Sequence, residues 1–205
     1  MEAASVLLFS GGIDSVTLLH QLVADGEPVQ ALFIDYAQRA AAQERAAAHA
    51  QCGELGVELV PFELANVGEI FRRGQDRKHH VPLPHRNLVA LSIGLSYAAN
   101  LGARKLYLAV NLDDTADYAS ASLAFLAQFR LICGLLGDVR LATPFVALAK
   151  REVIQRGVAL GVDYATTYSC LLGYPAHCGR CPQCRKRREA FRQAGIDEPA
   201  SFYRV

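Results

Sequence analysis

Apolar positions along the chain follow two spacings, one typical of strands and one typical of helices. A continuous apolar run over Ser5–Phe9 predicts a strand, and helical spacing over Asp14–Ala24 predicts a helix after a glycine-containing turn. The pattern then predicts strands over Val29–Ile34, Gly56–Val60 and Lys105–Val110 and helices over Ala40–Leu55, Asn87–Leu101, Ala119–Leu136 and Lys150–Leu160. Strands that alternate with helices predict an α/β fold, with an open, mostly parallel sheet and helices on both faces.

Two segments depart from this alternation. Residues 65–86 lack convincing periodicity, and at this length they are interpreted as a mobile lid over a site, with plain surface disorder as the alternative. Their histidines, His79, His80 and His85, are assigned to the lid rather than to a metal site. The chain after Thr166 is rich in cysteine and ends in a short predicted helix over Arg185–Ala194. We therefore expect an α/β domain over residues 1–165 and a tail over residues 166–205 that packs on it.

The composition favours a compact, folded protein. Of 205 residues, 52% are hydrophobic and 20% are charged, which argues against disorder. The net charge of +1 gives no global reason to expect a nucleic acid or a membrane as partner. The first ten residues fit neither a signal nor a transit peptide, and the longest uncharged stretch, 87–103, is too short to span a membrane. We expect a cytoplasmic protein whose cysteines stay reduced.

The turn after the first strand predicts an anion site. Ser10-Gly11-Gly12-Ile13-Asp14-Ser15 stands where an open parallel sheet places ligands, at the carboxyl end of a strand and the start of a helix. Free backbone N–H groups and the hydroxyls of Ser10 and Ser15 would bind a pyrophosphate there. A carboxylate repels phosphate unless a cation intervenes, so Asp14 is expected to hold Mg²⁺. The plain alternative is a tight turn capped by Asp or Ser.

Four of the six cysteines are spaced as metal ligands. Cys170, Cys178, Cys181 and Cys184 give C-x7-C-x2-C-x2-C, and four thiolates can close a tetrahedral, structural zinc site. An iron–sulfur cluster and unpaired buried cysteines are the alternatives. Cys52 and Cys133 stand alone in helical patterns and are predicted to be small core residues.

Basic residues gather around the cysteines. They either offset the negative charge of a zinc tetrathiolate or bind RNA. The basic residues are Arg180, Arg185, Lys186, Arg187, Arg188 and Arg192, against the single acid Glu189.

The motifs together resemble a known enzyme family. SGGxDS resembles the pyrophosphate loop (PP-loop) of the N-type ATP pyrophosphatases, and with the cysteines the chain resembles the 7-cyano-7-deazaguanine synthases, the QueC or ExsB family, along nearly its whole length. Phe9 to Ser15 matches FSGGxDS, Asp35-Tyr36 with Gln38-Arg39 matches DYxQR, Pro84 to Asn87 matches PxRN, Val110-Asn111 matches VN, and Thr167 to Gly195 follows the pattern around the family's structural zinc.

This resemblance implies a fold, a reaction and a site. The fold would be of the adenine nucleotide alpha hydrolase type. Family members are typically homodimers that convert 7-carboxy-7-deazaguanine, ammonia and ATP into 7-cyano-7-deazaguanine. The implied residues are, for ATP, Phe9, Ser10, Gly11, Gly12, Asp14, Ser15, Asp35, Gln38 and Arg39; for catalysis, Asp14, Lys150 and Arg86; and for the substrate, Arg86, Asn87, Asn111, Asp114 and Tyr118. A solvent-exposed Lys150 and a helix-capping Asn87 are the plain alternatives.

The chain departs from the family pattern within residues 113–124. The family's YSGYPDCR-like segment is replaced by Thr115 to Ser122, and of its side chains Asp114, Tyr118 and Phe125 remain. The histidine that follows QR in the family is Ala40 here, and the next glutamate stands one position late, as Glu44. The departures keep other functions open: a QueC-like paralogue that delivers the adenylated acid to another amine, an RNA-modifying PP-loop enzyme, and a nucleotide-binding sensor.

Overall fold

A parallel sheet forms the centre of the molecule. The computed structural model describes residues 5–73 and 83–204, and within these the sheet has five strands in the order β3-β2-β1-β4-β5, all paired in parallel. The strands are β1 (Ser5–Leu8), β2 (Val29–Asp35), β3 (Leu59–Glu63), β4 (Lys105–Leu108) and β5 (Arg140–Ala142). The order reverses beside β1, because β2 and β3 extend to one side of it and β4 and β5 to the other.

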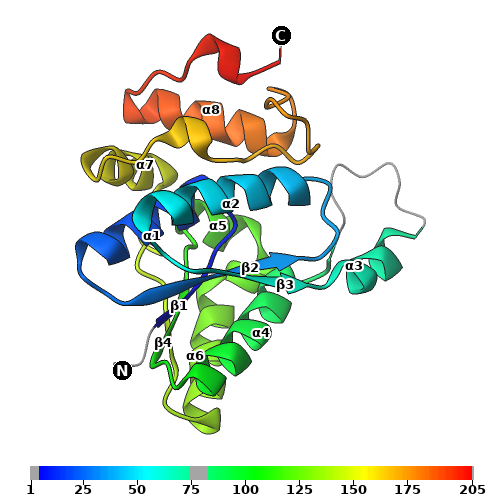
Figure 1. Ribbon diagram of the computed structural model, residues 1–205, viewed down its shortest axis with the longest axis vertical. Helices are drawn as coiled ribbons and strands as arrows, with labels where there is room; N and C mark the ends of the chain where they lie inside the picture. The colour runs from blue at the N-terminus through cyan, green and yellow to red at the C-terminus, as the bar shows by residue number, and fades with distance from the viewer. Residues whose placement is uncertain (1–4, 74–82, 205) are drawn as a thin grey trace.

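Helices cover both faces of the sheet, as the alternating pattern predicts. The helices α1 (Ile13–Ala24), α2 (Ala41–Leu55) and α7 (Lys150–Ala159) lie above the sheet in Figure 1, and α4 (Arg86–Leu101) and α6 (Leu123–Leu136) lie below it. Successive residues of a strand point to opposite faces, so Leu7 packs with α1 and α7, while Val6 and Leu8 pack with α4 and α6. Cys52 and Cys133 are buried in these two cores, which confirms their prediction as core residues.

Several predicted boundaries differ from the structure. The third strand begins at Leu59, three residues later than predicted, and the long helix begins at Leu123 rather than Ala119 because the Ser122 side chain accepts a hydrogen bond from the Phe125 N–H. Residues 119–121 form a 3₁₀ turn. The periodicity did not predict β5, α3 (Ala65–Arg72) or α5 (Leu112–Asp117), each of which is eight residues or shorter.

The segment read as an aperiodic lid contains a helix. Over 65–72 the chain forms α3, whose Gly68 lies so close to the Tyr36 carbonyl that a Cβ there would come within 1.7 Å of the oxygen. Arg72 also donates a hydrogen bond to the Ala37 carbonyl. This part of the predicted lid is therefore packed on the loop after β2. Residues 74–82, with His79 and His80, lie outside the described residues.

The tail folds back over α7. Its helix α8 (Pro182–Ala194) begins earlier than predicted, with Cys181 as its N-cap and a proline in its first turn, and it packs along α7 (Figure 1). Ala190 and Phe191 enter the core that α1 and α7 share. A 3₁₀ turn at 164–166 leads into the tail, and another at 200–202 follows α8. Across the described ranges, no helix combines the length and the apolar character that a membrane crossing requires.

One basic residue of the tail is internal. The Arg187 side chain is 1% exposed and pairs with Glu198 at 2.6 Å. It also donates hydrogen bonds to Thr167 Oγ1 and the Tyr164 carbonyl, both at 2.8 Å. Arg187 therefore joins the tail to the α/β domain, and the interpretation of this residue as part of an RNA-binding surface is wrong.

Candidate active site

A pocket of about 280 Å³ opens at the point where the strand order reverses. Its floor includes the carboxyl ends of the neighbouring strands β1 and β4, through Leu8 to Ser10 and Leu108 to Val110. The loops after these two strands run in opposite directions across the sheet, which leaves a crevice between them. The pocket therefore lies where the position of the glycine turn predicts a ligand site.

The glycine turn presents the start of α1 to this pocket. Gly12 is the N-cap of α1, and no side chain caps the helix in the described structure, so the first backbone N–H groups are left to a ligand. Ser10 Oγ and Ser15 Oγ lie 3.2 Å apart, and the Ser15 hydroxyl donates to the Gly12 carbonyl. The pocket lining includes both serines and Gly12.

Gly11 has a packing role in addition to the one predicted for it. Its φ is +70°, and a Cβ there would lie 2.7 Å from the Glu44 carbonyl oxygen and 2.9 Å from the Ala48 nitrogen. This glycine therefore allows α2 to approach the turn closely. Gly11 is not among the residues that line the pocket, and its contact with ATP stays a prediction.

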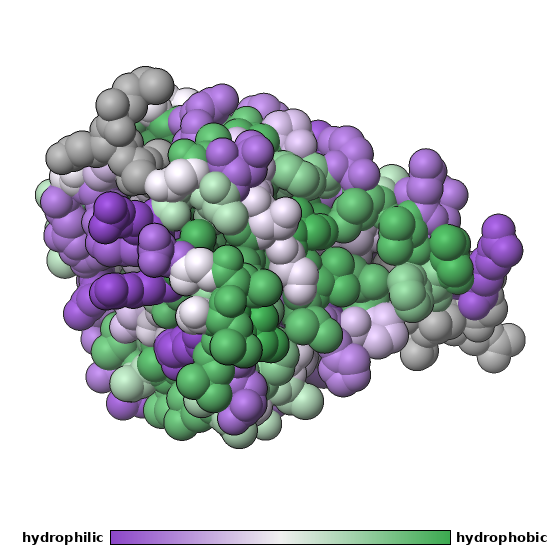
Figure 2. All heavy atoms as spheres, turned by 90° about the horizontal axis from the view of Figure 1, so that it is seen from below, coloured by the Kyte–Doolittle hydropathy of each residue, from purple (hydrophilic) through white to green (hydrophobic). Residues whose placement is uncertain are grey.

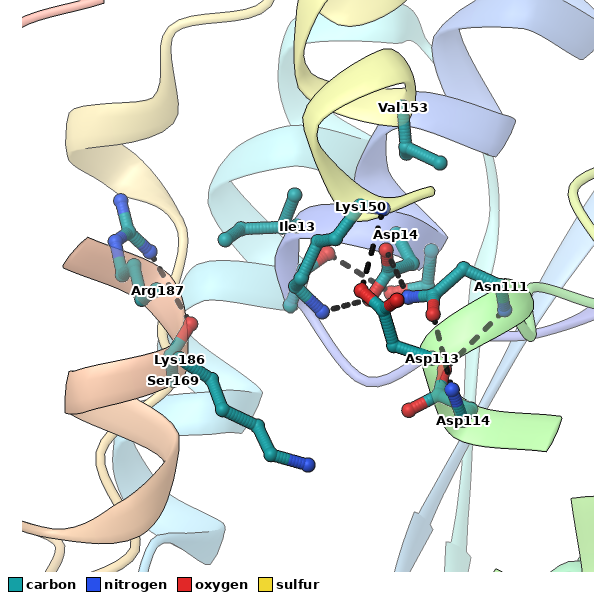
Figure 3. Close-up of polar contacts among 12 residues, drawn as sticks. Ile13, Asp14, Asn111, Asp113, Asp114, Lys150, Val153, Ser169, Lys186 and Arg187 are labelled. Carbon is teal, nitrogen blue, oxygen red and sulfur yellow. Dashed lines mark hydrogen bonds and ion pairs between the residues drawn. The ribbon is translucent and has the colours of Figure 1, made fainter. Parts of the chain in front are cut away.

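Asp14 lies in a network of charged and polar side chains (Figure 3). Lys150 Nζ, from the start of α7, is 2.6 Å from one Asp14 carboxylate oxygen, and Asn111 Nδ2, from the loop after β4, is 3.0 Å from the other. Burial lowers the pKa of Lys150, but Asp14 and Asp114 outweigh that effect and raise it above its usual value. Lys150 is therefore a charged partner of Asp14, and its interpretation as a solvent-exposed lysine is wrong.

A second carboxylate shares this network. Asn111 and Asp114 form a reciprocal cap at the start of α5, in which the Asp114 N–H donates to Asn111 Oδ1 and the Asn111 N–H donates to Asp114 Oδ2. Burial, and then repulsion by Asp14, raise the pKa of the Asp114 carboxyl. The Asp14 and Asp113 carboxylates lie beside Lys150, and Asp114 lies next to Asn111 (Figure 3). Carboxylate oxygens are the ligands that Mg²⁺ prefers.

The loop after β2 forms the opposite wall. Gln38 Nε2 donates to Glu44 Oε2 at 2.8 Å, and Tyr36 and Arg86 complete this side of the lining. Burial raises the pKa of the Glu44 carboxyl and of the Tyr36 hydroxyl. Asp35 and Arg39 belong to the same motif but do not line the pocket; the Asp35 carboxylate instead binds Arg45 at 3.0 Å.

The predicted substrate residues lie at different depths. Arg86, Asn87, Asp114 and Tyr118 line the pocket, whereas Asn111 is fully buried behind it and reaches it through Asp14. Asn87 lies inside α4 and donates to the Ser120 carbonyl at 3.1 Å, so the helix-capping interpretation is wrong; the N-cap is His85.

Sequence reasoning did not identify several lining residues. Tyr36 stands at the carboxyl end of β2, next to β1, and that position was a usable signal. Ser169, Leu171 and Gln183 come from the tail, and nothing in their sequence pattern distinguishes them from ordinary neighbours of the cysteines.

The four predicted metal ligands converge in the tail. The Sγ atoms of Cys170, Cys178, Cys181 and Cys184 all lie within 4.8 Å of one another, and all four residues are buried. A tetrahedron with Zn–S bonds of about 2.3 Å would separate its sulfurs by roughly 3.8 Å. The Cys178 and Cys184 sulfurs are 3.8 Å apart. An iron–sulfur cluster fits this group less well, because its thiolates bind different irons and must stand farther apart.

Backbone N–H groups point at the sulfurs as they do around a bound thiolate. The N–H groups of Arg180 and Cys181 donate to Cys178 Sγ, and that of Cys184 donates to Cys181 Sγ. Burial raises the pKa of the Cys178 thiol, but these hydrogen bonds and those from the Cys170 and Cys181 side chains lower it more, to about 7 overall. The donor set therefore fits a structural zinc ion.

Comparison with known proteins identifies similar chains and similar folds. The family model described as "Queuosine biosynthesis protein QueC" matches residues 4–195. The chain is 32% identical to a protein named 7-cyano-7-deazaguanine synthase 1 from Sulfurisphaera tokodaii, over 97% of each chain. It is 35% identical to a 7-cyano-7-deazaguanine synthase from Thiobacillus denitrificans, over 100% of each chain. Among solved structures, the NMN synthetase of Francisella tularensis is similar with a TM-score of 0.57 at 16% identity, over 97% of this chain and 80% of that one, which shows a shared fold.

Proposed function

The chain belongs to the QueC family, and from that membership we propose that its pocket carries out the ATP-dependent synthesis of 7-cyano-7-deazaguanine. The observation that carries this conclusion is the near full-length match to relatives named for that activity. The pocket supports it, because uncapped helix N–H groups, a lysine and carboxylates meet there. The protein is thus an ATP-dependent ligase that forms carbon–nitrogen bonds.

We propose that ATP binds with its phosphates at the start of α1. The N–H groups of the first turn and the hydroxyls of Ser10 and Ser15 would bind the β- and γ-phosphates. Lys150 would neutralise part of their charge. Asp14 and Asp114 would hold Mg²⁺, which offsets the negative charge of the leaving pyrophosphate.

The proposed reaction proceeds in two activations. A carboxylate oxygen of 7-carboxy-7-deazaguanine attacks the α-phosphorus of ATP, pyrophosphate leaves, and an acyl adenylate forms. Ammonia attacks the acyl carbon and AMP leaves, which gives the amide. The amide oxygen then attacks the α-phosphorus of a second ATP and pyrophosphate leaves. Loss of AMP, which carries the oxygen away, and of the two amide protons gives the nitrile. None of these steps needs a covalent bond to the protein, so the pocket acts by positioning and by charge stabilisation.

The pocket lining also bears on the alternative of a second acceptor. Of residues 113–124, where the chain departs from the family pattern, the two that line the pocket are Asp114 and Tyr118, and both remain from that pattern. The lining therefore gives no reason to prefer delivery of the acyl adenylate to an amine other than ammonia, on a protein or a small molecule.

The decisive experiment follows ATP cleavage and product mass. We expect purified protein to release AMP and pyrophosphate when 7-carboxy-7-deazaguanine and Mg²⁺ are both present. Mass spectrometry with and without ammonia separates the nitrile, the amide and an amine conjugate. Cleavage that depends on tRNA and not on the acid would support the RNA-modifying alternative and overturn this proposal.

We also propose that the protein is a homodimer. The outer face of α6 is apolar and exposed, with Leu131 at 63% and Leu135 at 85% exposure. Figure 2 shows apolar side chains gathered on the underside of the molecule, the side that α4 and α6 cover in Figure 1. Exposed apolar patches of this kind commonly mark protein contacts, and a second copy of the chain is the occupant consistent with the family.

A further inference from the structure

Four residues of the cysteine tail belong to the pocket wall. Tyr168, Ser169 and Leu171 lie within two positions of Cys170, and Gln183 lies between Cys181 and Cys184. Each is therefore one or two positions from a sulfur of the metal cluster. The cluster and the pocket, which the sequence separates into a tail and a domain, share one continuous stretch of structure.

The position of Gln183 is fixed by its neighbours. It stands in the first turn of α8, where the Cys184 N–H donates to Sγ of the capping Cys181 at 3.4 Å. Its side chain is half-buried, and its Nε2 donates to the Tyr118 hydroxyl at 3.2 Å. Among the described residues no donor reaches the Gln183 side-chain oxygen and no acceptor takes the Tyr118 hydroxyl proton. The Gln183 side-chain oxygen thus remains as an acceptor for a ligand, and the Tyr118 hydroxyl remains as a donor.

Tyr118 is held firmly by two helices. Lys186, one turn after Gln183 on α8, forms an ion pair with Asp117 and lies with its Nζ 5.5 Å from the Tyr118 ring centroid. Arg86, from α4, lies 5.7 Å from the same centroid. The Lys186 side chain extends from α8 toward the side on which Asp114 lies (Figure 3). The tail therefore fixes both members of the Gln183–Tyr118 pair.

We propose that Gln183 is a specificity-determining residue that recognises the ring of the acid substrate by hydrogen bonding, and that the cysteine cluster positions it. This inference rests on the proposed function. The substrate class is a planar heteroaromatic carboxylic acid whose edge carries both donors and acceptors. A carboxamide next to a hydroxyl offers the matching acceptor and donor, and a polar edge that enters the pocket without such partners would bind poorly.

The test compares two glutamines of the same helix. Gln183→Ala should raise the KM for 7-carboxy-7-deazaguanine about tenfold, as expected for one or two lost hydrogen bonds, and change the KM for ATP and kcat little. The dissociation constant of the acid, measured by calorimetry without ATP, should rise by the same factor while the zinc content is unchanged. Gln183→Glu, which keeps an acceptor oxygen but loses the N–H that contacts Tyr118, should bind the acid more weakly than the wild type. The control is Gln193→Ala, an exposed position on α8 where Gln193 bonds to Glu189.

Each result decides between the two hypotheses. If the wild-type protein turns over the acid and Gln183→Ala leaves the KM and the dissociation constant of the acid unchanged, Gln183 does not recognise the ring. The inference is then overturned, while the proposed function stands. An equal rise in the KM for ATP would equally overturn it, because it would indicate general damage to the pocket. If the wild type neither binds nor converts the acid, the proposed function itself fails.

Discussion

The side chains of Asp14 and Lys150 meet at 2.6 Å although 136 positions separate them in the chain. The resemblance to the family predicts both residues, but it does not predict that they form a pair. Pairing depends on how α7 is placed against α1, which is a property of the tertiary structure. The same holds for Arg187, which looks like a surface cation in the sequence and is internal because Glu198, Thr167 and Tyr164 surround it.

Asp14→Asn tests the central charge of the pocket. The amide keeps the size of the side chain but leaves Lys150 without a charged partner at 2.6 Å and removes a carboxylate ligand for Mg²⁺. We expect the folded state to persist and kcat to fall by about 10²-fold or more, which is typical when a key electrostatic group is lost. Initial rates of AMP release measure this effect. Asp25→Asn, an exposed change at the other end of α1, is the control, and near-normal turnover of Asp14→Asn would remove its proposed role.

Glu44 makes stability depend on pH. Burial raises its pKa in the folded state, so the stability it contributes is present below the unfolded pKa near 4.5 and is lost as the pH rises through the folded value. Glu44→Gln keeps an acceptor for Gln38 and removes the ionisation. The variant should be more stable than the wild type and should therefore melt at a higher temperature. The gap between their free energies of unfolding should widen from pH 5 to pH 8 by about 1.4 kcal/mol for each unit by which burial raises the pKa of Glu44.

Thermal melts across that pH range test this expectation. Glu54→Gln, an exposed change on the same helix, should show no such trend. A gap that stays constant or narrows with pH would contradict the assignment of Glu44.

Elements with strong periodicity could be read from the sequence, whereas short elements defined by neighbours could not. Val29–Asp35 and Lys105–Leu108 carry runs of apolar residues and were predicted nearly to their ends. In contrast, β5 has three residues and begins with an exposed arginine, and α5 has no buried residue at all. The helix α5 is defined by the reciprocal cap between Asn111 and Asp114. The strand β5 is defined by its pairing with β4.

Gly11 packs against α2, so a substitution at this position tests the contact between the glycine turn and that helix. Gly11→Ala would place a Cβ at positive φ and within 3 Å of two backbone atoms of α2. We expect a loss of about 2 kcal/mol or more in the free energy of unfolding, measured with urea. Gly53→Ala on α2, where nothing lies within 4 Å of the added Cβ, should be neutral or stabilising by up to about 1 kcal/mol. Equal stability of the two variants would show that the turn and α2 can separate freely.

Across the whole molecule, the sequence predicted the layers, the position of the pocket and the cysteine cluster. It did not predict that the tail forms part of the pocket. Motifs identify residues that do chemistry, whereas Gln183 and Leu171 reach the pocket because of the path that the chain takes between the cysteines. The division of the chain at residue 165 remains a prediction.

Cys178→Ser tests the role of the metal in the whole fold. Loss of one thiolate from a four-sulfur site should abolish zinc binding and, because structural zinc supplies folding free energy, most of the soluble protein as well. Metal analysis of purified protein should find one zinc per chain in the wild type and in Cys133→Ala, a cysteine outside the cluster. Normal zinc content and solubility of Cys178→Ser would contradict a structural site.

The apolar face of α6 gives a prediction about assembly. Leu135→Glu introduces a charge at a position that is 85% exposed, so the folded monomer should be unaffected. Light scattering should report about twice the chain mass for the wild type and the chain mass for the variant. Val158→Glu, an exposed apolar position on α7, is the control and should stay dimeric. A monomeric wild type would refute the dimer.

The wall formed by Gln183 also bears on the order of events during synthesis on the ribosome. A nascent chain that has emerged as far as α7 already contains the glycine turn, Asp14 and Lys150, but it lacks Ser169, Leu171 and Gln183. Such a chain also lacks Ala190 and Phe191, which pack in the core that α1 and α7 share. Under the proposal for Gln183, we therefore expect the acid to bind only once the tail has been synthesised and has packed on the domain.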